Sequence, residues 1–285
     1  MQIFNLFKSK GKGKIANIGI GLGSDRSQNL KIVQTIDNFL ENNSSNIKLF
    51  GTPEVVTELL KEYIISKDNL ELIKSQQPEK EIITYLKEHK INAIIRGNLN
   101  SSLFLKQLKT LLTVSEVNRI ALLETIDGTQ FFFGPVGIDE CNDFHKKINF
   151  IERAIILFKD LQLEPKIGIL SGGRLNDMGR DKYVDKTINI AKKVVNYFRQ
   201  TYPKLNIQHD EILIEKLLLN ESNLIIAPDG ISGNLIYRTL VHLGGGKAYG
   251  AIYMGLNYII IDTSRVGNMT EIEGALVLAL ALIEG

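Results

Sequence analysis

Several loops of this 285-residue chain contain an arginine close to side chains that could bind an anion or transfer a proton. The most heavily loaded loop, SGGRLNDMGR, begins at Ser171 and places Arg174 and Arg180 on either side of Asp177. Backbone N–H groups next to two guanidinium groups make a site for an anion such as a phosphate. The alternative is that both arginines only pair with nearby aspartates at the surface, and residue chemistry alone does not separate the two interpretations.

A second loop of this kind lies in IIIDTSRVGNMTEIEGAL, near the C-terminal end. An apolar strand ends at Asp262, and the chain then presents Ser264 and Arg265. Thr270 is in a position to cap a helix that has Glu271 in its first turn. Taken alone, Glu271 is best explained as a carboxylate that stabilises the helix dipole. The functional alternative is a general base next to an anion bound by the arginine.

The third loop is RGNLNSS, in which Arg96 and Gly97 follow the strand INAII. We expect Ser101 or Ser102 to cap the helix that comes next, and capping is enough to explain these serines. A helix N-terminus beside an arginine is also a phosphate site, so Arg96 is a candidate for anion binding.

Three other sequence features give little support for a cofactor, metal or nucleophilic site. The N-terminal GIGLGSD lacks the full G-x-G-x-x-G spacing of dinucleotide-binding loops, and the chain has no P-loop lysine, so we do not predict NAD binding. The four histidines show no metal-ligand spacing, and we predict no metal site. Cys141 lies in a predicted loop without a visible base, which argues against a nucleophilic cysteine.

The elements that must position these loops alternate along the chain. Short β-branched runs are separated by longer amphipathic runs, which favours an α/β fold with mainly parallel sheets and ligands beyond the carboxyl ends of the strands. We expect strands within 14–23, 46–51, 69–75, 91–97, 119–126, 128–136, 166–173, 223–230 and 258–265, and helices within 27–43, 52–64, 79–89, 102–112, 145–163, 181–202, 233–244 and 274–283. The basic segment before the first strand is expected to be a solvated lead-in.

Composition narrows the class of protein. Hydrophobic residues make up 44% and charged residues 23% of the chain, with a net charge of +2, which is ordinary for a globular protein and gives no reason to expect a nucleic-acid or membrane partner. A single cysteine excludes an intramolecular disulfide framework and fits a cytoplasmic location. The N-terminus does not resemble a signal peptide. The most apolar run, 274–283, is too short to span a bilayer and predicts a buried helix.

The run PDGISGNLIYRTLVHLGGGKAYGAIYMGLNYIIIDTSR resembles the C-terminal signature of the phosphate acetyl/butyryl transferases. That pattern is P-D-x-x-x-G-N-x-x-Y-[KR], then L-G-G-[AG]-x-A-x-G, then a strand and D-x-S-R. AIIRGNLNSSLFLKQL and KIGILSGG resemble two further segments of the family. The resemblance implies two three-layer α/β domains with mainly parallel sheets and an inter-domain cleft, of the isocitrate/isopropylmalate dehydrogenase-like, phosphotransacylase type. The implied domains are 1–143 with 257–285, and 144–256, in a homodimer.

Site residues follow from the matched positions. Ser264 and Arg265 match the family's S-R pair, which contacts the acyl phosphate. Glu271 stands where these enzymes have a catalytic aspartate that deprotonates the thiol of coenzyme A. His242 stands where they have an arginine, and the loop at Ser171 offers Arg174 and Arg180 in place of hydroxyl groups. Within the matched motifs we expect anion binding or cofactor binding by Asn234, Gly244 and Gly245.

At the positions where it departs from that family, this chain resembles a subgroup, the MtxX proteins of methanogenic archaea. This subgroup is also called methanogenesis marker protein 4. That group is provisionally labelled a methyltransferase subunit. The resemblance implies a cytoplasmic transferase that moves a methyl or acyl group to or from a thiol or phosphate and acts on a small anionic metabolite. Coenzyme A or another thiol coenzyme would be a substrate, and a methyltransferase complex is a possible partner. The alternatives are a phosphate acetyl/butyryltransferase and a non-catalytic, anion-binding accessory subunit.

Overall fold

The computed structural model describes residues 2–64 and 67–283 and divides into two compact units. We call Asn118–Lys247 the central unit, and Gln2–Val117 together with the residues from Ala248 onward the terminal unit. Both units are α/β with mostly parallel strands, as the alternating pattern predicted. The units divide after Val117 and Lys247, whereas the sequence placed domain boundaries after residues 143 and 256. Which segments form domains that fold separately stays a prediction.

The sheet of the terminal unit has the strand order β3-β2-β1-β4-β11-β10. Neighbouring strands are parallel except β10 and β11, which are antiparallel. Strand β11 therefore ends at the same edge as β1 and β4, which brings the loops after Arg96 and Asp262 to that edge. The strands are β1 (Asn17–Gly21), β2 (Asn46–Gly51), β3 (Leu70–Lys74), β4 (Ala93–Ile95), β10 (Lys247–Met254) and β11 (Ile259–Asp262).

The glycines of GIGLG have a packing role at this edge. Gly97 has a φ of +60°, and a Cβ atom there would lie 2.2 Å from the carbonyl oxygen of Gly21. A Cβ at Gly23 would lie 1.9 Å from the carbonyl oxygen of Asn98. The end of β1 and the loop after β4 thus approach more closely than larger residues permit.

Helices complete the terminal unit. One buried cluster joins α4 and α5 to the sheet and includes Phe50, Ile82 and Phe104. The helix at residues 274–283 was predicted to be buried, and this is confirmed for α10, which packs against α1 and α2. The helices are α1 (Ile3–Gly11), α2 (Arg26–Leu40), α3 (Pro53–Glu62), α4 (Pro78–Lys87), α5 (Ser101–Leu112) and α10 (Met269–Leu282).

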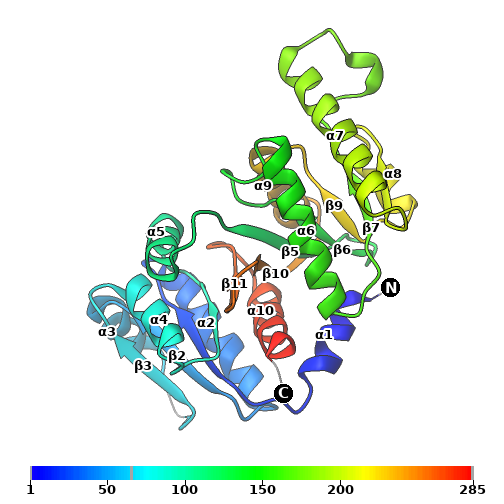
Figure 1. Ribbon diagram of the computed structural model, residues 1–285. Coiled ribbons are helices and arrows are strands. Elements are labelled where there is room, and N and C mark those ends of the chain that lie inside the picture. The colour runs from blue at the N-terminus through cyan, green and yellow to red at the C-terminus, as the bar shows by residue number, and fades with distance from the viewer. Residues whose placement is uncertain (1, 65–66, 284–285) are drawn as a thin grey trace. The chain divides into compact units, whose positions relative to one another are not determined.

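The prediction for the N-terminal segment was wrong. Instead of a solvated lead-in, the chain forms α1, which lies beside α10 in Figure 1. Ile3, Phe4 and Phe7 recur on one helical face and are buried. This spacing was the available signal, and the lysines that follow obscured it.

Several predicted helix caps also require correction. The Thr52 side chain caps α3 by accepting a hydrogen bond from the backbone N–H of Val55. In the other cases a nearby Asp or Asn, whose short side chain reaches the N–H two or three residues ahead, is the N-cap. Asn100 is the N-cap where the sequence predicted Ser101 or Ser102, and Asn268 is the N-cap where it predicted Thr270. Asp25 caps α2.

The sheet of the central unit has the strand order β5-β6-β9-β7-β8. Strands β5 and β6 are antiparallel, and the other neighbouring pairs are parallel. The short polar strand β8 was not predicted. The elements are β5 (Asn118–Glu124), β6 (Gln130–Gly134), α6 (Phe144–Asp160), β7 (Lys166–Ile169), the 3₁₀ turn η1 (Leu175–Asp177), α7 (Lys182–Thr201), β8 (Asn206–His209), α8 (Ile214–Leu219), β9 (Leu224–Ile226) and α9 (Gly230–His242).

Three consecutive glycines end α9. The N–H of Gly244 donates to Thr239 O at 2.9 Å, and Gly245 has a φ of +70°. A Cβ on Gly246 would lie 2.7 Å from the carbonyl oxygen of Glu124. Helix termination and close backbone approach therefore account for this run without a ligand. In the part of the chain that the structure describes, no helix has both the length and the apolar character needed to cross a membrane.

Candidate functional site

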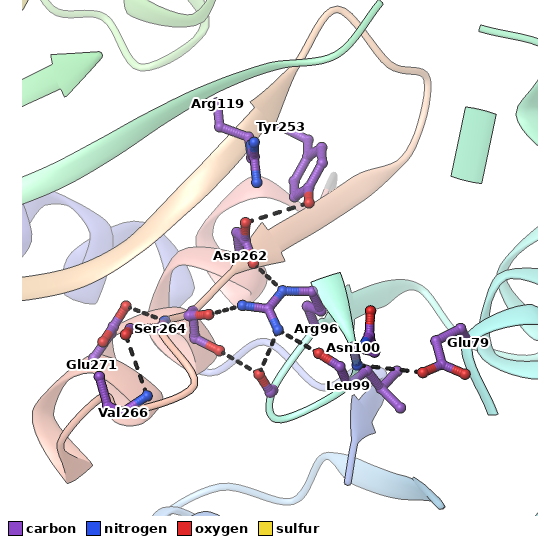
Figure 2. A network of polar contacts seen from close by, with 12 residues as sticks. Glu79, Arg96, Leu99, Asn100, Arg119, Tyr253, Asp262, Ser264, Val266 and Glu271 are labelled. Atoms are coloured by element: carbon purple, nitrogen blue, oxygen red, sulfur yellow. Dashed lines mark hydrogen bonds and ion pairs between the residues drawn. The ribbon is translucent and has the colours of Figure 1, made fainter. Parts of the chain in front are cut away.

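The loop after β11 is fastened to the loop after β4 by Arg96 (Figure 2). The guanidinium forms an ion pair with Asp262 through Nε and donates to the carbonyl oxygen of Thr263 through Nη2. Nη1 donates to Leu99 O at 2.7 Å and to Gly97 O at 3.2 Å. The Arg96 side chain is only 4% exposed, so its nitrogens are engaged within the protein.

Glu271 holds the same loop from the other side. Its Oε1 accepts a hydrogen bond of 2.8 Å from the backbone N–H of Ser264, while Asn268 caps the backbone N–H of Glu271 at 3.0 Å. The residue is 2% exposed and lies in the first turn of α10. A Cβ on Gly267 would lie 2.4 Å from Oε2, so a larger residue at this position would displace either the carboxylate or the loop.

Arg265 lies between these two anchors. It is exposed, and among residues 2–64 and 67–283 no hydrogen bond or ion pair involves its guanidinium. The Ser264 hydroxyl accepts from the N–H of Val266 at 3.3 Å and is partly exposed. The structure thus brings together four residues predicted from sequence: Arg96, Ser264, Arg265 and Glu271. A fixed loop that presents an available guanidinium beside a partly exposed hydroxyl can bind an anion, and the Glu271 carboxylate lies buried behind this loop.

The predicted loop of the central unit is held mostly by its own side chains. Ser171 is fully buried, where its hydroxyl donates to Gly173 O at 2.8 Å and lies 2.9 Å from Nε2 of His209. Burial lowers the pKa of His209, so the ring is neutral near pH 7. The N–H of Gly172 donates to the hydroxyl of Thr187 at 2.8 Å. Ser171 therefore shapes the loop from inside and presents no hydroxyl at its surface.

Arg174 and Arg180 lie in this loop and are both exposed. Nη1 of Arg180 pairs with Asp177 at 2.5 Å, and the other carboxylate oxygen of Asp177 accepts the backbone N–H of Arg174 at 2.8 Å. Two hydrogen bonds hold the pKa of Asp177 below its ordinary value. The larger effect comes from the backbone N–H of Arg174 and the smaller from the side chain of Arg180. The sequence left surface pairing open as an alternative, and Arg180 makes such a pair.

A polar cluster at the end of β9 lies in the same unit and was not predicted. Asp229 caps α9 through the N–H of Ser232 at 2.8 Å and accepts a hydrogen bond from the hydroxyl of Tyr183. Burial acts to raise the pKa of Asp229, but the bonds from Tyr183 and Ser232 outweigh it and lower the pKa. The same contact raises the pKa of Tyr183 to about 12. The buried ammonium of Lys147 holds the preceding turn by donating to Ala227 O at 2.7 Å.

The remaining predicted residues are spread along α9. Asn234 donates to Val136 O at 3.0 Å, close to the point where a Cβ on Gly233 would meet Pro135 O at 1.9 Å. His242 lies in the last turn, where burial and the charge of Arg238 lower its pKa. A neutral ring at a helix C-terminus is a weak partner for an anion. Roles for Asn234, His242 and the glycines in binding stay predictions.

Some residues that shape the site escaped sequence analysis. Asn268 stands three positions before Glu271, which is the spacing of an N-cap and an N3 carboxylate and was a readable signal. His209 and Tyr183 act across long sequence separations and left no local signal. Within the described ranges, no group of three or more His, Cys, Asp or Glu side chains is arranged to hold a metal ion.

Comparison with known proteins identifies the family. No protein-family model matches the chain. A protein of Methanosarcina mazei that carries the provisional name methyltransferase mtx subunit X is 36% identical over 280 residues, which cover 98% of this chain and 95% of that protein. This chain belongs to the MtxX family. The protein of the same name from Methanosarcina barkeri is 43% identical to this MtxX chain over 75% of this chain and 77% of the relative.

Solved structures show the fold that this MtxX member shares. A branched-chain phosphotransacylase from Enterococcus faecalis gives a TM-score of 0.71 at 17% identity and covers 94% of this chain and 99% of that one. The EutD phosphotransacetylase from Staphylococcus aureus gives 0.70 at 16% identity over 98% of both chains. A 4-hydroxythreonine-4-phosphate dehydrogenase from Klebsiella pneumoniae gives 0.60 at 11% identity over 93% and 99%. The fold is thus that of the phosphotransacylases.

Proposed function

We propose that this chain is a transferase that binds the anionic part of its substrate at Arg265 and transfers a small group to or from a thiol. The observation that carries this proposal is the exposed guanidinium of Arg265, on a loop held at its two ends by the buried side chains of Arg96 and Glu271. Preorganised charge of this kind recognises phosphate or carboxylate without first having to order the loop.

Acyl transfer is the first candidate reaction. The thiol sulfur attacks the carbonyl carbon of an acyl phosphate, the new S–C bond forms, and the C–O bond to the phosphate breaks. Glu271 is 2% exposed, so the loop that covers it first moves aside to admit the thiol. The Glu271 carboxylate then accepts the thiol proton, Arg265 stabilises the charge that develops on the oxygens, and phosphate leaves. The likeness to phosphotransacylases supports this reaction at the level of the fold. Coenzyme A or another thiol coenzyme would be the co-substrate.

Methyl transfer is the second candidate, and the name of the relatives in Methanosarcina favours it. The thiol sulfur would attack the methyl carbon of a methyl donor, the S–C bond would form as the bond between the methyl carbon and the donor breaks, and the donor would leave with that electron pair. Glu271 would again take the thiol proton. Arg174 and Arg180 would then bind a phosphate or carboxylate in the central unit. A small anionic metabolite is the substrate class that both versions share.

Glu271→Gln separates catalysis from a purely accessory, anion-binding role. Glutamine keeps an oxygen that can accept the Ser264 N–H but cannot take a proton at neutral pH. We expect phosphate binding to persist while turnover falls about 10²- to 10⁴-fold. The matched control is Glu273→Gln, an exposed position on the same helix. If Glu271→Gln leaves turnover unchanged, Glu271 is not the base.

The finer architecture belongs to the same proposal. We propose two α/β domains with a cleft, of the isocitrate dehydrogenase-like type, and the likeness in fold to a 4-hydroxythreonine-4-phosphate dehydrogenase supports this description. A homodimer, a cytoplasmic location and association with a methyltransferase complex are expectations from the family resemblance, and sedimentation of the purified protein tests the first.

A further inference from the structure

We propose that Arg96 is a positioning residue, which sets the place of Ser264 and Arg265 by joining two loops, and that it does not bind substrate. This inference rests on the proposed function of Arg265 and deepens it. It also changes the role of Arg96, for which the sequence suggested anion binding.

The first reason is that the guanidinium of Arg96 is already occupied. Nε pairs with Asp262, Nη2 donates to Thr263 O, and Nη1 donates to Leu99 O at 2.7 Å (Figure 2). With 4% of the side chain exposed, a substrate anion could reach it only after these bonds break. Breaking them would leave the Asp262 carboxylate and two carbonyl groups without these donors, which is costly in a buried place.

The second reason is where these acceptors lie. Asp262 is the last residue of β11, and Thr263 is the first residue of the loop that presents Arg265. The hydroxyl of Thr263 donates back to Gly97 O at 3.3 Å, so the two loops meet at further points. Arg96 therefore fixes the start of the loop, while Glu271 fixes the next residue, Ser264, through its N–H.

The third reason is the shape of the group. A planar guanidinium can donate in several directions within one plane, which suits a carboxylate on one side and backbone carbonyls on the other. The ammonium of a lysine is a compact charge and cannot reach all of these acceptors at once. The neighbouring loop is itself anchored, because the Asn98 amide donates to Asp25 O at 2.9 Å and to the side chain of Asn29 at 3.0 Å.

The test combines hydrogen exchange with binding of inorganic phosphate. We expect Arg96→Met to speed amide exchange across residues 263–268 about tenfold, and to weaken phosphate binding about tenfold, because the loop must be ordered on binding. Arg96→Lys should show smaller changes in both amide exchange and phosphate affinity, since lysine keeps the charge next to Asp262. Arg265→Ala should weaken phosphate binding at least as much as Arg96→Met does, and should leave the exchange of this loop unchanged.

Leu49→Ala is the matched control for lost stability, since Leu49 is fully buried in β2 of the same unit and β2 is not a neighbour of β11 in the sheet. It should lower the thermal midpoint without changing exchange at 263–268 or phosphate affinity.

Two outcomes would overturn the inference. Unchanged exchange at 263–268 in Arg96→Met would show that Arg96 does not hold the loop. Complete loss of phosphate binding in Arg96→Met with unchanged exchange would make Arg96 a direct ligand. If instead Arg265→Ala binds phosphate normally, the proposed function fails, while the exchange data still decide the positioning role.

Discussion

The carboxylate of Glu271 accepts the backbone N–H of Ser264 at 2.8 Å, across seven positions of sequence and from inside the first turn of α10. This bond closes the loop that carries Arg265 onto the helix that follows it. A residue suited to act as a base therefore also shapes the loop that presents the arginine. Helix α10 sets the position of Glu271, and Glu271 in turn holds the buried side of the loop.

Gly267→Ala should disturb this arrangement directly. The added methyl group would lie 2.4 Å from Oε2 of Glu271 and 3.1 Å from the carbonyl oxygen of Ser264, so the carboxylate or the loop must shift. We expect a loss of about 1–3 kcal/mol in the free energy of unfolding, measured with urea, and weaker phosphate binding. Gly128→Ala is the control for the binding measurement: its φ of +87° makes alanine costly in stability, but nothing lies near the added methyl group, so phosphate affinity should stay at the wild-type value. Wild-type phosphate affinity in Gly267→Ala would contradict the importance of the closed loop.

Asp177→Asn tests whether the central-unit loop binds anions. Removal of the carboxylate charge releases Arg180 from its surface ion pair, while the amide oxygen can still accept the Arg174 N–H. Because such pairs contribute at most about 1 kcal/mol, we expect phosphate affinity to rise by roughly two- to fivefold. Adding Arg180→Met to Asp177→Asn should cancel the gain. No change in affinity would leave Arg180 with its surface ion pair alone.

Tyr183→Phe should have a pH-dependent effect on stability. The Tyr183 hydroxyl favours the ionised form of Asp229, so its contribution is present above the ordinary aspartate pKa and is lost as pH falls through the lowered pKa. The pKa of Tyr183 is raised to about 12, so the contribution is also lost as pH rises toward that value.

Urea unfolding of Tyr183→Phe across a pH series measures this effect. The variant should be less stable than wild type by about 1 kcal/mol between about pH 5 and about pH 9, with a smaller difference on both sides. Tyr202→Phe, at a residue that is 41% exposed, provides the control. A difference in the free energy of unfolding that stays constant, to about 0.5 kcal/mol, from pH 3 to pH 11 would contradict the coupling of the two groups.

Much of the architecture followed from local sequence, while the contacts that shape the site did not. Continuous apolar runs such as YIIID predicted buried strands, and the placement of Arg265 and Glu271 on a strand–loop–helix segment was readable. The Arg96–Asp262 pair joins residues 166 positions apart, so no local pattern could reveal that Arg96 is engaged within the protein. Ser171 was predicted to take part in anion binding, but its side chain is buried and its hydroxyl lies 2.9 Å from His209, which comes from β8, a strand without a clear sequence pattern.

The most direct measurement is thioester formation from acetyl phosphate or butyryl phosphate and coenzyme A, comparing wild type with Arg265→Ala. Arg199→Ala, at an exposed arginine of α7, is the matched control. The account predicts that wild type and Arg199→Ala form thioester, and that Arg265→Ala is slower by about 10²- to 10³-fold. Equal rates in Arg265→Ala and wild type would contradict the assignment of Arg265. No thioester from any of the three proteins would contradict acyl transfer and direct the same comparison to methyl donors.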